Sequence, residues 1–247
     1  MSQICDRGDN MANRDISLAP RAENTREPTP VSPPIQFSLP DIKQHFIDSM
    51  ATVKAQYDVA ASLESDGNIE ACKTVWRSQV VLAEGLLDFY IHEISKYCLF
   101  RMFSGQWDKS SKYKSIKIPM DKVEEAIAAV ESNDWFFAYL NDRFSRDVFL
   151  SCESMKDQLN LIGVEFKAVL VKAFPKDSEG MSVEYGKDVI QKLFQRRNEI
   201  AHQNDRSHAN AEQTDITKSF VENYIGDIES IVNSMHEIAE EKDAAHL

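Results

Sequence analysis

The chain has 247 residues, of which 43% are hydrophobic, so it can bury a substantial core in one large or two small domains. Its net charge of −12 argues against broad, non-specific binding to duplex DNA, although a local basic patch can still contact RNA. No apolar run approaches the ~20 residues that span a bilayer, and the N-terminus lacks the charged-then-apolar order of a signal peptide. We expect a soluble, cytoplasmic protein that binds no membrane.

The distribution of proline predicts an all-α fold. Six of the eight prolines lie at or before Pro40, so the remainder of the chain is almost free of helix breakers. Residues 1–37 are polar and, from Pro20 onward, rich in Pro and Asn, which predicts a disordered N-terminal tail. Residues 38–242 are expected to form one helical domain.

The first two helices are long. Ser38 is a candidate N-cap, because Pro40 suits the first turn and Asp41 follows three residues after the cap. This helix is expected to run to about Leu63, where the breaker sequence is ESDGN. A second helix is predicted over residues 69–103, and a loop over residues 104–115.

Shorter helices follow, predicted over residues 120–130, 133–144 and 155–174. The sequence PKDSEG then precedes a helix that ends near His202. The loop NDRSHANAEQ separates this helix from the last one, for which Thr214 is a candidate cap.

The helix that ends near His202 contains the stretch FQRRNEIAHQND, residues 194–205. Its apolar positions recur at three- and four-residue intervals and predict one buried stripe: Val189, Ile190, Leu193, Phe194, Ile200 and Ala201. Arg197 falls on that stripe, and a buried arginine is costly unless it is paired or lines a polar cleft. Neighbouring helix residues point about 100° apart, so Arg196 is expected to face solvent or the rim of the cleft.

The residues of this stretch suit the cleavage of RNA without a metal. If the 2′-hydroxyl attacks its own phosphate, the reaction needs a proton acceptor near neutral pH, for which His202 is the natural side chain. It also needs a fixed cation for the charge that develops on the phosphate, and a guanidinium can contact two phosphate oxygens at once. We expect His202 to act as general acid/base and Arg197 as phosphate clamp, with Asn198 orienting the phosphate or the imidazole.

The order of Arg, a polar residue, three more residues and His, followed by one further helix, resembles the R-x4-6-H motif of HEPN domains. The sequence RNEIAH is similar to the RNxIAH segment of the RiboL-PSP-HEPN-like group. Two further segments resemble the helix and the pre-motif segment of that family: SQVVLAEGLLDFYIHEISKYCL and MKDQLNLIGVEF. The chain departs from the family at Gln203, where Gly is common, and at Asp88, the best match to the usual Glu of the second helix.

The resemblance implies a HEPN-like helical bundle over roughly residues 40–240, in which Asp88 helps to hold Arg197. It also implies a homodimer, because family members usually build the active cleft from two motifs across a two-fold axis. The activity implied is that of an endoribonuclease of the toxin–antitoxin or antiviral defence type, acting on transfer or messenger RNA. A neutralising antitoxin protein is an expected partner, and no cofactor is expected.

Other interpretations remain open at this stage. The Arg and His can merely satisfy the last carbonyls and the dipole of their helix, and Asp88 can be a structural carboxylate. A basic run that includes Trp107 and Tyr113 is either a patch that guides RNA or a solvated loop; its cations are Lys96, Arg101, Lys109, Lys112, Lys114 and Lys117. The alternative function is a non-catalytic helical dimer that binds RNA, nucleotide or a protein.

The four cysteines are widely spaced and form neither a CxxC pair nor a metal-ligand cluster: Cys5, Cys72, Cys98 and Cys152. A reducing cytosol is therefore the expected compartment, and the sequence predicts no metal site.

Overall fold

The computed structural model describes residues 35–128 and 132–246, and these ranges contain helices and loops without a β-strand. The predicted all-α fold is confirmed. Most of the predicted N-terminal tail, residues 1–34, lies outside the described residues, as do residues 129 and 130 of the third predicted helix. The helices are α1 Leu39–Ser65, α2 Ile69–Phe103, α3 Met120–Ala128, α4 Asp134–Phe144, α5 Cys152–Leu161, α6 Phe166–Ala173, α7 Glu179–Gln203 and α8 Lys218–Ala245, with a short 3-10 helix, η1, at Tyr113–Ser115.

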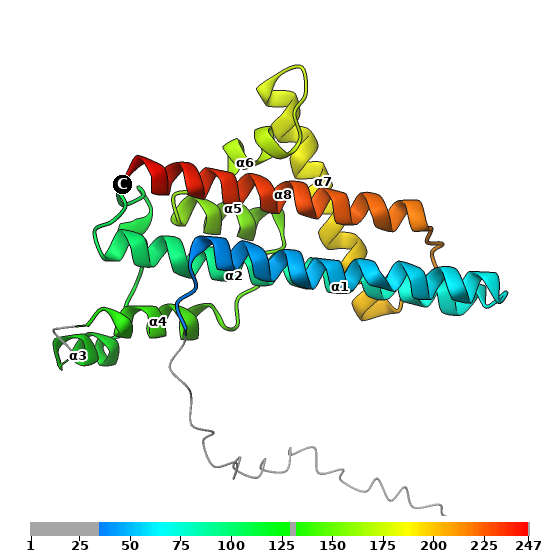
Figure 1. Ribbon diagram of the computed structural model, residues 1–247, viewed down its shortest axis with the longest axis horizontal. Coiled ribbons are helices and arrows are strands. Elements are labelled where there is room, and N and C mark those ends of the chain that lie inside the picture. Colours follow the sequence, from blue (N-terminus) through cyan, green and yellow to red (C-terminus); the bar gives the residue numbers. More distant parts are fainter. Residues whose placement is uncertain (1–34, 129–131, 247) are drawn as a thin grey trace, which may run out of the picture. The chain divides into compact units, whose positions relative to one another are not determined.

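Helices α1 and α2 form a long antiparallel pair, and α8 runs beside them (Figure 1). The predicted cap of α1 is confirmed, because the Ser38 hydroxyl accepts a hydrogen bond from the Asp41 amide while the Asp41 carboxylate accepts one from the Ser38 amide. The turn between α1 and α2 contains Gly67 with a φ of 75°, a conformation that glycine adopts without steric cost. None of the helices in the described ranges is long and apolar enough to cross a membrane.

Two predicted helix boundaries were wrong. The segment 155–174 forms two helices, because the chain turns at Gly163, which has a φ of 74°, and the Asn160 side chain then accepts a hydrogen bond from the Phe166 amide. The last helix is capped by Thr217, whose hydroxyl accepts a hydrogen bond from the Phe220 amide; Thr214 lies in the preceding loop. The turn at Gly163 ends the first helix and the Thr217 side chain caps the last one, and apolar periodicity reveals neither boundary.

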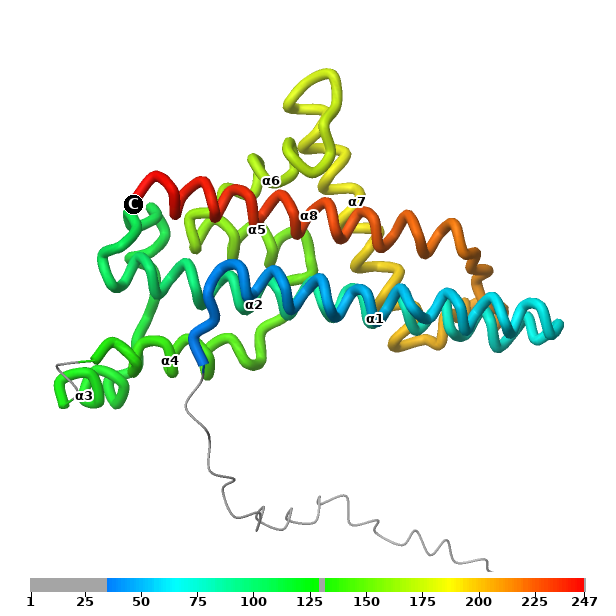
Figure 2. Tube along the Cα trace, viewed as in Figure 1, coloured from blue at the N-terminus to red at the C-terminus, as the bar shows by residue number. Residues whose placement is uncertain are grey.

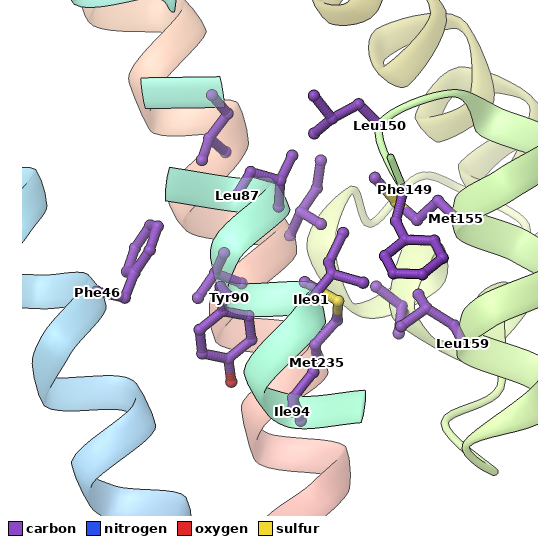
Figure 3. Close-up of a cluster of buried hydrophobic side chains, with 14 of the residues drawn as sticks. Phe46, Leu87, Tyr90, Ile91, Ile94, Phe149, Leu150, Met155, Leu159 and Met235 are labelled. Atoms are coloured by element: carbon purple, nitrogen blue, oxygen red, sulfur yellow. The ribbon is translucent and has the colours of Figure 1, made fainter. Parts of the chain in front are cut away.

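The core lies around α2 (Figure 3). Phe46 of α1 packs on one side of α2, Met235 of α8 on another, and α5 with the segment before it on the third. Helix α2 is therefore surrounded over much of its length, which is why charged residues such as Arg77, Glu84 and Glu93 are buried on it. Each of these charges needs a partner inside the protein.

Helix α7 crosses the other long helices steeply and ends near the α1–α2 pair (Figure 2). Gly186 permits the crossing of α7 with α6, because a Cβ atom there would lie only 2.9 Å from the Leu170 Cδ2 atom and 3.0 Å from the Phe174 Cδ2 atom. The crossing brings the C-terminal half of α7 against α2. The stretch that contains Arg197 therefore packs on the helix that contains Glu84.

Candidate active site

Both ends of helix α7 are defined by local interactions of the chain. Ser178 caps its start by accepting a hydrogen bond from the Met181 amide. The helix ends at Gln203, because Asn204 and Asp205 adopt left-handed conformations with φ of 50° and 60°. His202 is in the last turn and its side chain is exposed.

The predicted apolar stripe of α7 is confirmed only in its first part. Val189, Ile190 and Leu193 are buried, whereas Phe194 and Ile200 are half-buried and Ala201 is exposed. The last two turns of α7 therefore emerge from the core, and the prediction that Ala201 is buried was wrong. Because the last turns are partly open, polar side chains there can reach both the protein interior and a bound molecule.

Arg197 is half-buried and is only partly satisfied by the protein. One terminal nitrogen donates a hydrogen bond to the Asn198 side-chain oxygen at 3.0 Å. Its Nε atom is buried and has no hydrogen-bond partner among the described residues. A guanidinium carries five donor hydrogens in a fixed fork, so most of those of Arg197 remain free for an anion.

The charge of Arg197 acts on the carboxyl group of Glu84, which belongs to α2. Glu84 is buried, and desolvation raises its pKa from 4.5 to about 7, although the Tyr224 hydroxyl and the charge of Arg197 act in the opposite direction. The Tyr224 hydroxyl lies 3.2 Å from the Glu84 carboxyl group and 2.8 Å from the Leu193 carbonyl oxygen. It has one proton, so when it donates to Leu193 a protonated Glu84 can donate to it.

Sequence reasoning missed Glu84, although a signal for it was available. Val80, Glu84, Leu87 and Ile91 follow each other at helical spacing, so an acid stands in an apolar stripe of α2. The same argument identified Arg197 on α7. An isolated charge on each of two packed stripes indicates that the two lie near each other, because each lowers the cost of burying the other.

Asp88, the acid selected from the sequence, has a different set of contacts. Its carboxylate accepts a hydrogen bond from the Phe149 amide at 2.8 Å, and its other oxygen lies 3.7 Å from the His92 Nε2 atom. Neither Asp88 nor Glu84 forms a hydrogen bond or an ion pair with Arg197 in the structure, but Glu84 bonds Tyr224, whose hydroxyl also bonds the Leu193 carbonyl of α7. The bond to Phe149 holds the segment between α4 and α5 against α2, which is the structural role that the sequence left open for Asp88.

The prediction that Arg196 faces solvent or the cleft rim was wrong. Its side chain is 11% exposed and forms two hydrogen bonds to the carboxylate of Asp205, which is fully buried. Its guanidinium also lies 5.6 Å from the centre of the Phe220 ring. Arg196 is 100° from the stripe, as expected, but the loop after α7 folds back and covers it.

Arg197 and His202 diverge within one chain. Five residues of helix separate them, which corresponds to about 140° around the helix axis. Asn198 is one turn before His202 and lies nearer to its side of the helix. One chain therefore presents an inward arginine and an outward histidine, with Asn198 between them.

Two cations of the basic run around Trp107 are engaged inside the protein, whereas Lys109, Lys112, Lys114 and Lys117 are exposed. Lys96 is buried and pairs with Glu93 at 2.7 Å, and Arg101 lies 3.5 Å from Asp243. The Trp107 indole is buried and donates a hydrogen bond to Asp243 at 2.8 Å. Trp107 is therefore not free to stack on an RNA base.

The high pKa of Glu84 predicts a specific dependence of stability on pH. Because the folded pKa of about 7 exceeds the unfolded 4.5, the folded state holds an extra proton between these values. The contribution of this extra proton to the free energy of unfolding is fully present below pH 4.5 and is lost as the pH rises through 7. In denaturant unfolding, Glu84→Gln should remove most of the fall in unfolding free energy between pH 4.5 and 7 and should stabilise the protein at pH 8. Glu222→Gln, at an exposed site of α8, should do neither. Equal pH profiles for wild type and Glu84→Gln would contradict the assignment.

Comparison with protein families identifies the domain. A family model described as RiboL-PSP-HEPN matches residues 62–241. Neither the comparison with curated proteins nor that with solved structures finds a match. The matched range includes α2 with Glu84 and α7 with Arg197 and His202. Since it takes in well over half of the chain, the protein belongs to the RiboL-PSP-HEPN family, whose domains are typically those of ribonucleases.

Proposed function

We propose that the protein is a metal-independent endoribonuclease that cleaves RNA by attack of the 2′-hydroxyl on the adjacent phosphate. The observation that carries this proposal is the state of Arg197, which is half-buried, uses a terminal nitrogen to bond the Asn198 side chain, and lies five positions before an exposed His202. A purely structural arginine at a helix end donates to the last carbonyls, whereas Arg197 bonds only the Asn198 side chain among the residues that the structure describes. The terminal nitrogens of Arg197 are thus available to a phosphate, whereas its Nε atom is buried.

The proposed roles follow from these positions. Arg197 binds the scissile phosphate and stabilises the charge that develops on it. His202 accepts the 2′-hydroxyl proton as general base or donates a proton to the leaving oxygen as general acid. Asn198 orients the phosphate or the imidazole, and Glu84 takes the supporting role that the resemblance gave to Asp88.

The active cleft is proposed to form in a homodimer. Leu82 and Phe89 of α2 are 46% and 48% exposed, and Gly85 lies between them on the same face. A Cβ atom at Gly85 would meet nothing within 4 Å, so the isolated chain has no need of glycine in the middle of a helix. A two-fold axis near this face lets α2 helices approach closely and brings Arg197 of one protomer toward His202 of the other.

The substrate class proposed is transfer or messenger RNA, in a toxin–antitoxin or antiviral setting with a neutralising protein partner. This setting rests on the family and on the motif. The local chemistry fits any single-stranded RNA whose 2′-hydroxyl can reach the in-line position, since His202 is exposed at the end of α7.

The proposed chemistry predicts the products and their independence of metal. Purified protein should cleave RNA in the presence of excess EDTA, because His202 supplies the base and Arg197 supplies the cation. Mass spectrometry should find a 2′,3′-cyclic phosphate on the upstream fragment and a 5′-hydroxyl on the downstream one. If RNA stays intact under all conditions, the non-catalytic binding dimer becomes the better description; 5′-phosphate products would contradict the mechanism.

The proposed dimer predicts the behaviour of an interface variant. Phe89→Glu places a charge on the apolar face of α2 and should convert the dimer to a monomer in light scattering, with loss of cleavage. Met120→Glu is the matched control, because Met120 of α3 is 71% exposed and lies away from this face. Cleavage at the wild-type rate by a monomeric Phe89→Glu protein would rule out a shared cleft.

A further inference from the structure

The loop after α7 contains a buried carboxylate that bonds two helices. Asp205 is fully buried, and its Oδ2 atom accepts hydrogen bonds from the Arg77 Nε atom at 2.7 Å and from Arg196 at 2.9 Å. Its Oδ1 atom accepts a further bond from Arg196. Arg77 belongs to α2 and Arg196 to α7, so Asp205 joins the loop to two helices.

The backbone of the same loop takes part in this network. Asp205 donates its amide hydrogen to the Glu199 carbonyl at 2.9 Å, and its own carbonyl accepts a hydrogen bond from Thr214 at 2.8 Å. Arg77 also donates to the Thr214 carbonyl at 2.8 Å. The two sides of the 204–216 loop are therefore held together at the point where α7 ends.

His202 has no comparable support of its own. Its side chain is exposed, and the structure records no hydrogen bond from its imidazole to another described residue. Its position therefore depends on the backbone of the last turn of α7. That turn would be free to fray, as helix ends do, if the loop after it were not anchored three residues beyond His202.

Helix α2 connects this anchor with the proposed cleft. Arg77 and Glu84 are seven residues apart, two turns of the same helix face, and both face α7. Arg77 holds the end of α7 through Asp205, and Glu84 bonds Tyr224, whose hydroxyl also bonds the Leu193 carbonyl of α7. One face of α2 thus sets the position of both halves of the motif relative to each other.

We propose that Asp205 is a positioning residue that holds His202 for proton transfer, acting through the Arg77–Asp205–Arg196 network. This inference rests on the proposed function. Asp205 does not touch the substrate. It fixes the last turn of α7, so its loss is expected to lower kcat by misplacing the imidazole while binding of RNA, which depends on Arg197, changes little.

The experiment compares full-length wild type with Asp205→Asn, which keeps the side-chain shape and removes the charge. The control is Asp215→Asn, because Asp215 lies in the same loop and pairs with Lys73 while its side chain is 70% exposed. The measurements are kcat and KM on one RNA and amide hydrogen exchange along the chain. Hydrogen exchange tests whether Asp205 anchors the loop, even if the wild type does not cleave RNA. The proposed function is tested separately, by whether the wild type cleaves RNA at all.

We expect Asp205→Asn to lower kcat at least tenfold with KM within threefold, and to speed exchange at residues 199–206 at least tenfold. Exchange in the buried part of α8 should stay as in wild type, because a positioning role is local. Asp215→Asn should match wild type in all measurements. A folded Asp205→Asn protein with wild-type exchange at 199–206, or with wild-type kcat, would overturn the proposal.

A second variant keeps the test decisive if Asp205→Asn does not fold, since that substitution removes the counter-charge of the buried Arg77. Arg77→Lys retains the charge and leaves Asp205 paired with Arg196, but it loses the bond to the Thr214 carbonyl or to Asp205. It should show the same local increase in exchange and a smaller fall in kcat. If Asp205→Asn does not fold, wild-type exchange at residues 199–206 and wild-type kcat in Arg77→Lys would overturn the proposal.

Discussion

His202→Ala is expected to lower the rate of RNA cleavage by roughly 10²–10⁴-fold, the usual contribution of a positioned acid or base. The unfolding temperature should not change, because the side chain is exposed and packs against no core residue. The measurement is the initial rate of cleavage of one RNA by purified protein, beside a thermal unfolding curve. Expression of both proteins in cells, with growth and RNA integrity followed, gives the same comparison without purification.

His208→Ala is the matched control, because His208 is also exposed and lies six residues further along the chain, in the loop after α7. It should cleave at the wild-type rate. Equal rates for His202→Ala and wild type would show that another group moves the proton, and would return the motif to a structural role at the helix end.

Arg197→Lys is expected to reduce cleavage more than tenfold, which corresponds to about 1.4 kcal/mol of transition-state stabilisation. Lysine keeps the charge near Glu84 but offers the phosphate a single ammonium group, whereas the guanidinium contacts two phosphate oxygens at once. Stability should change little, since Arg197 makes one hydrogen bond, to its neighbour Asn198. The same initial-rate and unfolding measurements check both expectations.

Arg196→Lys provides the comparison, and its expected effect differs in kind. It breaks the paired hydrogen bonds to the buried Asp205 carboxylate, at a cost of roughly 1–3 kcal/mol in unfolding free energy. The cationic charge stays beside Asp205, so at temperatures where the protein is folded the fall in cleavage should be smaller than for Arg197→Lys. A larger loss of cleavage at Arg196, with no loss of stability, would mean that the phosphate clamp is the other arginine.

The sequence alone determined the fold class and most helices of this protein. Helix α1 starts at the predicted cap and α2 spans the predicted range, because capping chemistry and apolar periodicity are local properties of the chain. The break between α5 and α6 escaped prediction, since Gly163 is tolerated inside a helical pattern and only its positive φ ends the helix. The motif around Arg197 and His202 was also readable, because it lies within one helix.

The tertiary structure decided which charges meet. Asp88 and Glu84 are both acids on α2, but the packing of α7 and α8 brings Glu84 to the Tyr224 hydroxyl and under the charge of Arg197. Asp88 instead binds the Phe149 amide. The position of Arg196 on the helix predicted exposure to solvent. The loop that returns after α7 instead buries Asp205 against its guanidinium. Such pairs join residues distant in sequence, and desolvation selects them: a buried charge is tolerated only where the folded chain supplies its partner.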